Sequence, residues 1–154
     1  MIGRATIQNR QGVTVKRFVG CFVLLWLSAL VQAAEVISPS PEGATVYFIE
    51  PLDGAVVPPT FTVKFGLKGM GIAPAGTDVP NTGHHHLLID QATLPDVAMP
   101  LPANDHILHF GKGQTETTVT LPPGQHTLQL VFGNYLHIPH TPPVVSARIT
   151  ITVK

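Results

Sequence analysis

The chain has a single cysteine in 154 residues, Cys21, and it lies in an N-terminal segment that we expect to be removed. The rest of the chain therefore cannot form a disulfide. The absence of thiolate ligands also excludes blue-copper centres, iron–sulfur clusters and thiolate zinc sites. A cysteine nucleophile is excluded for the same reason. The fold must be stabilised by its hydrophobic core alone.

Charged residues are scarce too, at 12% of the chain. Four of the nine basic residues lie in the same N-terminal segment: Arg4, Arg10, Lys16 and Arg17. The remaining chain keeps five basic and nine acidic side chains, a formal charge of −4. Because no basic patch remains, we expect the protein to bind neither nucleic acid nor anionic membrane surfaces.

The N-terminal segment has the pattern of a secretory signal peptide. Its basic residues precede an apolar stretch over residues 18–31, and Val31-Gln32-Ala33 is a small-residue cleavage site. The stretch is shorter than the roughly 20 residues of a membrane-spanning helix, which favours cleavage after Ala33 over an uncleaved anchor. We therefore predict a signal peptide over residues 1–33, a flexible leader over 34–44 and one domain over 45–154. The mature protein is expected to be periplasmic or secreted, without a membrane span.

Beyond residue 44, hydrophobic and polar residues alternate with a period of two, which is typical of half-buried β-strands. Seven such runs occur, at residues 45–49, 61–68, 84–90, 106–110, 117–121, 126–132 and 145–153. Turn sequences rich in proline and glycine separate them, and no helical pattern is present. The pattern predicts an all-β fold, an immunoglobulin-like antiparallel β-sandwich of about seven strands. The predicted core includes Phe61, Val63, Phe65, Leu128, Leu130, Phe132, Ile149 and Ile151.

The eight histidines all lie beyond residue 83, and five of them form two clusters. The first cluster opens one predicted strand, and the second lies in a loop expected at the same rim of the sandwich. Alternate residues of a strand share a face, and neutral imidazole is a common ligand for transition metals. We therefore predict a metal site at this rim. Its ligands are His84, His86, His137 and His140, with His85, Met70 and His109 as alternates.

The types of ligand limit the metal. Imidazole with a thioether suits copper, whereas imidazole with Asp90 or water suits zinc, so we predict copper or zinc. Two other interpretations remain open, because clustered histidines also hydrogen-bond to loop carbonyl groups or bind a ligand or a partner. His126 is expected at the opposite end of the sandwich, where backbone groups satisfy it.

Motifs for other chemistry are incomplete. In Gly111-Lys112-Gly113-Gln114-Thr115 the lysine is followed by glycine instead of serine or threonine, so this segment is better interpreted as a polar turn than as a phosphate loop. No Gly-x-Ser-x-Gly elbow is present. We therefore expect a binding protein and not a hydrolase.

Several blocks of the sequence resemble the bacterial family known as domain of unknown function 4399 (DUF4399). The blocks span residues 51–57, 82–90, 109–117, 123–130 and 137–146, and thus nearly the whole predicted mature chain. The resemblance implies an exported all-β domain. It implies no activity and no set of catalytic residues.

Three functions are compatible with these features. The first is a small exported binding protein that holds copper or zinc at a histidine-rich rim. The second is a noncatalytic immunoglobulin-like interaction module that binds a cell-envelope protein or a glycan. The third is a metal-dependent redox enzyme, because histidine-only copper sites on β-sandwiches can be redox-active.

Overall fold

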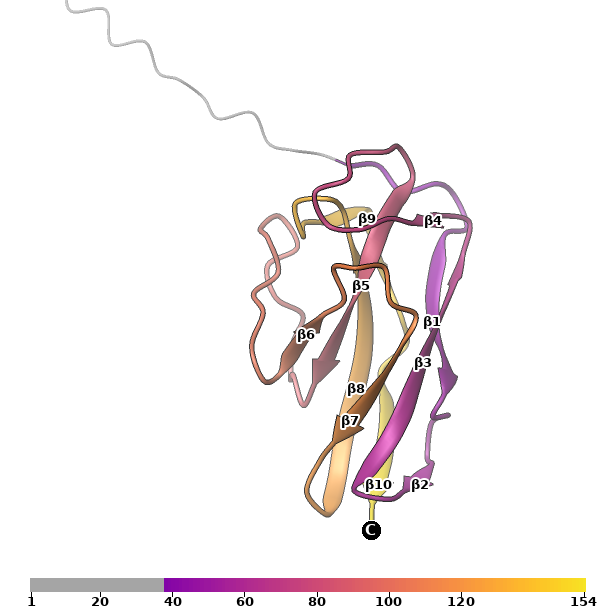
Figure 1. The fold of residues 1–154 in the computed structure, drawn as a ribbon, viewed down its shortest axis with the longest axis vertical. Coiled ribbons are helices and arrows are strands. Elements are labelled where there is room, and N and C mark those ends of the chain that lie inside the picture. Colours follow the sequence, from indigo (N-terminus) through magenta and orange to yellow (C-terminus); the bar gives the residue numbers. More distant parts are fainter. Residues whose placement is uncertain (1–37) are drawn as a thin grey trace, which may run out of the picture. The chain divides into compact units, whose positions relative to one another are not determined.

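The computed structural model describes residues 38–154, so the predicted signal peptide and the beginning of the predicted leader lie outside the described residues. The described residues form ten β-strands (Figure 1). They contain no helix long and apolar enough to cross a membrane. The strands are β1 (Thr45–Glu50), β2 (Val56–Val57), β3 (Thr60–Lys68), β4 (Gly71–Ile72), β5 (Thr82–Ile89), β6 (Ile107–His109), β7 (Glu116–Thr120), β8 (Gly124–Gly133), β9 (Pro139–Val145) and β10 (Ile149–Val153).

These strands form two sheets. The smaller sheet has the order β1-β3-β7, and the larger has the order β2-β10-β8-β5-β4, with β6 also paired to β5 and β9 to β8. Most pairs are antiparallel, whereas β2 is parallel to β10 and β4 is parallel to β5. The all-β fold is thus confirmed, and the two sheets are compatible with the predicted immunoglobulin-like sandwich.

Apolar side chains from both sheets meet in one core. Val63 of β3, Leu130 of β8 and Ile151 of β10 are all fully buried in it. All eight residues that the alternation predicts for the core belong to this cluster. Burying one such side chain stabilises the fold by about 1.5–3 kcal/mol, so the core compensates for the lack of disulfides.

β5, an interior strand of the larger sheet, is buried on both faces. Its Leu87 contributes to the core between the sheets, whereas Leu88 joins a second apolar cluster with Leu101, Ile107 and Val131. Adjacent residues of a strand point to opposite faces, so this second cluster lies on the outer face of the larger sheet. Leu101 comes from the loop between β5 and β6, which therefore covers part of that face.

The run predicted as one strand over residues 145–153 is in fact divided between β9 and β10. Ser146 lies at the break, where its Oγ accepts a hydrogen bond from the N–H of Leu130 at 2.9 Å. The N–H of Ser146 also donates to the carbonyl of Leu130 at 2.9 Å. Side-chain hydrogen bonds of this kind compete with the regular ladder. The prediction missed the break because the apolar alternation continues through it.

Residues 38–40, which belong to the predicted leader, pair with the beginning of β9. The N–H of Thr141 donates to the carbonyl of Ser38 at 2.9 Å, and the N–H of Ser40 donates to the carbonyl of Thr141 at 3.0 Å. The Oγ of Ser40 donates to the carbonyl of Pro142 at 2.7 Å. These bonds attach this short segment to the larger sheet.

Candidate metal centre

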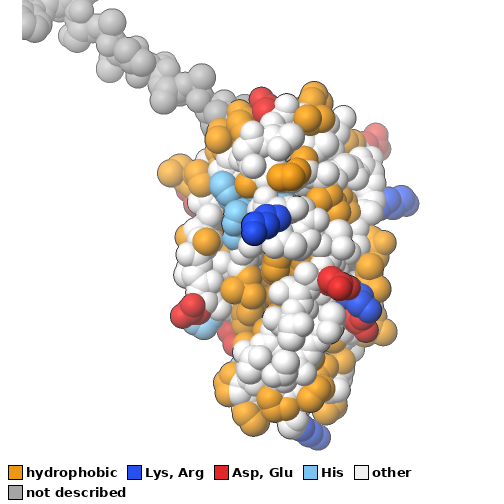
Figure 2. All heavy atoms as spheres, in the orientation of Figure 1, with side chains coloured by type: hydrophobic (Ala, Val, Ile, Leu, Met, Phe, Trp, Pro, Cys, Tyr) orange, Lys and Arg blue, Asp and Glu red, His pale blue; other side chains and the backbone are white. Residues whose placement is uncertain are grey.

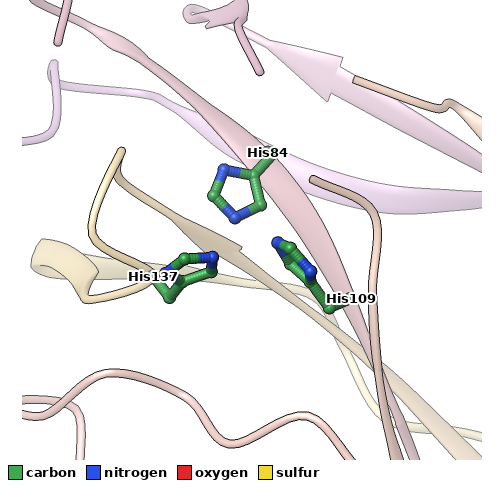
Figure 3. Close-up of side chains that lie close together, drawn as sticks. All are labelled: His84, His109 and His137. Atoms are coloured by element: carbon green, nitrogen blue, oxygen red, sulfur yellow. The ribbon is translucent and has the colours of Figure 1, made fainter. Parts of the chain in front are cut away.

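Four histidines converge on the outer face of the larger sheet. His84 and His86 lie on β5, His109 lies on β6, and His137 lies in the turn between β8 and β9. Figure 3 shows the rings of three of them pointing toward one another, and ring nitrogens of His84, His109 and His137 lie within 4.8 Å of one another. Nitrogen ligands bound to a tetrahedral ion at about 2.0–2.1 Å are roughly 3.3 Å apart, so ligation would draw these rings inward.

Strand pairing explains how three of these histidines meet. His84 and His86 share a face of β5 as alternate residues do. His109 is paired directly with His86 in the antiparallel β5–β6 ladder, and paired residues also share a face. The ring centroids of His84 and His109 are consequently only 4.9 Å apart.

The fourth histidine, His137, is presented by a turn built around Asn134. The buried Oδ1 of Asn134 accepts hydrogen bonds from the N–H groups of Leu136 at 2.8 Å and Ile138 at 3.0 Å. His137 has a φ of +68°, a left-handed conformation that is strained for residues other than glycine. Its carbonyl accepts a hydrogen bond from the N–H of Leu101 at 2.9 Å, which ties the turn to the loop that covers this face.

Two glycines leave room for the imidazole rings. A Cβ atom at Gly133 would lie 2.9 Å from Cε1 of His86, and one at Gly111 would lie 2.2 Å from Cε1 of His109. Any larger residue would displace these rings. The sequence predicted only a turn at Gly111 and no role for Gly133, which packs against a ring 47 residues away in the chain and so leaves no local pattern.

Several ring nitrogens of this cluster are buried without a partner. Both nitrogens of His84 and His86 and Nε2 of His109 are buried without a hydrogen-bond partner from the described chain. Burial, together with a smaller effect of neighbouring histidines, lowers the pKa of His84 to about 4 and that of His86 to about 3. Burial also lowers the pKa of His109, with His137 adding to the effect. Neutral imidazole is the form that binds metals.

The sequence comparison places this chain in a family. Residues 63–154 match the family described as domain of unknown function DUF4399. The chain belongs to the DUF4399 family. Neither the curated proteins nor the solved structures include a significant match to it. The matched residues of the DUF4399 domain include all four histidines of the cluster, while the family description names no activity.

His140 lies outside the cluster of this DUF4399 domain, although the sequence interpretation made it a ligand. Its Nδ1 lies 3.4 Å from the carbonyl of Phe132 and its Nε2 lies 3.2 Å from the carbonyl of Thr82. Its ring stacks on that of Phe132, with centroids 5.8 Å apart. β9 begins at Pro139, so His140 lies on a strand and not in the loop that was predicted to hold it.

The alternates His85 and Met70 are also outside the cluster. His85 points to the opposite face of β5 from His84 and packs against Phe65 and Phe132, with ring centroids 5.1 Å from each. Burial lowers the pKa of His85 to about 4. Met70 packs against the apolar core. Of the predicted residues, the DUF4399 fold thus brings together His84, His86, His137 and the alternate His109.

Asp90 and His126 form a separate pair at the other end of β5 and β8. Nδ1 of His126 lies 2.7 Å from Oδ2 of Asp90, and its Nε2 lies 2.9 Å from the carbonyl of Pro122. Oδ1 of Asp90 accepts a hydrogen bond from the N–H of Thr127 at 2.8 Å. The hydrogen bond to Asp90 raises the pKa of His126. Both side chains are therefore satisfied, and Asp90 is not near the histidine cluster.

Proposed function

We propose that this protein binds a transition-metal ion, copper or zinc, through His84, His109 and His137. The observation that carries the proposal is the convergence of their ring nitrogens to within 4.8 Å of one another. His126 and His140, which lie outside the cluster, have hydrogen-bond partners for their ring nitrogens, whereas His85, which packs between phenylalanine rings, has none. Both ring nitrogens of His84 and Nε2 of His109 have no hydrogen-bond partner within residues 38–154, and a metal ion would supply one.

The composition of the site favours copper or zinc over other ions. The group contains imidazole alone, without a carboxylate or thiolate ligand. Imidazole suits zinc and copper, whereas magnesium and calcium prefer oxygen ligands. His109 and His137 are partly exposed, so an ion can reach the site from solvent; Figure 2 shows histidine side chains at the surface. Because residues 1–33 have the pattern of a signal peptide, we expect the protein to bind its metal ion in the periplasm or outside the cell.

Titration calorimetry with Cu²⁺ and Zn²⁺ tests the proposal on tag-free protein purified after expression of the full chain. We expect one ion per chain with a Kd below about 10 μM. His84→Ala and His137→Ala should weaken binding at least tenfold, because each removes a ligand. The matched control is His126→Ala, which removes a histidine whose nitrogens are already paired. Absence of binding, or equal weakening by the control, would contradict the proposal.

A second candidate is the noncatalytic interaction module that binds a cell-envelope protein or a glycan. Exposed apolar side chains support this candidate. They lie in the loop between β5 and β6 and in the turn that holds His137. Met99 in the loop before β6 is 58% exposed, and Leu136 beside His137 is 39% exposed. This candidate becomes the better explanation if neither ion binds.

A further inference from the structure

The candidate site offers three ligands, whereas Zn²⁺ and Cu²⁺ bind at least four. We propose that the bound ion keeps an open coordination position on the solvent side of His109 and His137, and that this position binds a small anion. The inference rests on the proposed metal site and adds a second ligand to it. Zinc sites with four protein ligands are closed, whereas sites with three keep one position for water or a substrate.

The charge of the site favours an anion over a neutral molecule. The proposed ligands are His84, His109 and His137, and none of them carries a negative charge when it binds a metal. The ion therefore keeps its full positive charge. A basic residue, Lys112, follows Gly111, the glycine that packs against the ring of His109.

His86 is the side chain that would close the site if it became a fourth ligand. Its ring centroid is 4.8 Å from that of His84 and 5.2 Å from that of His109, but 6.0 Å from that of His137. It is fully buried and packs against Gly133, whereas His109 and His137 are partly exposed. His86 therefore lies on the buried side of the cluster. The side that faces solvent has no fourth protein ligand among the described residues.

Cobalt substitution tests the open position. Co²⁺ binds in place of zinc at imidazole sites, and its visible absorption changes when a ligand is added or exchanged. We would load tag-free protein from the full chain with Co²⁺ and titrate it with sodium azide. Sodium perchlorate at equal ionic strength is the control for a general salt effect. A saturable change with azide and none with perchlorate is the expected result. His86→Leu, which keeps a similar volume without ring nitrogens, should respond to azide as the wild type does.

The outcomes separate the two proposals. Absence of protein-bound Co²⁺ absorption, together with absence of Cu²⁺ and Zn²⁺ binding in calorimetry, would overturn the metal site itself. Absorption that azide leaves unchanged in the wild type but changes in His86→Leu would show that His86 closes the site, and this would overturn the open position. Absorption unchanged in both proteins, or changed equally by perchlorate, would also overturn it while leaving the metal site intact.

Discussion

His86 of β5 is paired directly with His109 of β6, and their ring centroids lie 5.2 Å apart on the outer face of the larger sheet. This pairing joins residues 23 positions apart in the chain. It also places His109 next to His84, because alternate residues of β5 share that face. The candidate metal centre thus depends on the register between two strands.

Replacing Gly133 should disturb the site without removing a ligand. In Gly133→Ala the new Cβ would lie 2.9 Å from Cε1 of His86, so the ring must move. We expect metal affinity to fall roughly 10-fold or more, because the displaced ring of His86 would press on the ligand His84, whose ring centroid is 4.8 Å away. Stability should fall by about 1–3 kcal/mol from overpacking. Calorimetry and urea unfolding measure the two effects.

Gly71→Ala is the control for that change. Its Cβ would approach only a side-chain methyl group of Thr82 at 3.3 Å. Equal effects of the two substitutions on metal affinity would show that Gly133 has no special relation to the cluster.

Metal binding should raise the thermal stability of the protein. An ion at 100 times its Kd that binds only the folded state stabilises that state by about 2.7 kcal/mol. For a domain of this size we expect Tm to rise by roughly 10 °C, as measured by calorimetry or circular dichroism. A chelator should reverse the rise, and His137→Ala should abolish it. A rise of equal size in His137→Ala would contradict ligation by that residue.

Stability should decrease in mild acid because of His85. Burial lowers the pKa of His85 to about 4, so the unfolded chain takes up a proton before the folded one does. The stabilisation is therefore fully present above the unfolded value of about 6.5 and is lost as the pH falls from there toward about 4. Each such histidine contributes a slope of up to about 1.4 kcal/mol per pH unit in this window.

Urea unfolding between pH 7 and pH 4 measures this dependence. His85→Leu has no ionisable group at that position and should show a shallower decrease than the wild type. The slopes of the two proteins would be the same if His85 did not stay neutral in the folded state.

The pair formed by His126 and Asp90 should have the opposite dependence. Asp90 raises the pKa of His126, so the folded state holds the proton more tightly than the unfolded state does. This stabilisation is present below about 6.5 and is lost as the pH rises through the folded value. His126→Ala should therefore lower the urea midpoint more at about pH 6 than at about pH 9. If the urea midpoints of variant and wild type differed by the same amount at both pH values, the charge-assisted pair would be excluded.

The alternation of residues by itself determined which faces of the main strands are apolar. Phe61, Leu128 and Ile151 are buried as their phase predicts, because a strand turns alternate side chains to the same side whatever its partners are. The same local rule determined that His84 and His86 share a face. It did not predict that Val131 would be buried, because the covering loop belongs to a distant part of the chain.

The membership of the site was decided by tertiary structure. The direction of His109 depends on which residue of β5 it pairs with, and that register is set by contacts far apart in sequence. His137 and His140 are close neighbours in the chain, yet a strained turn directs one into the cluster while the beginning of β9 places the other between carbonyl groups. Local spacing predicted that histidines would gather at the end of the sheet where β5 begins and β8 ends. Only the packing of strands and turns selected which imidazoles meet.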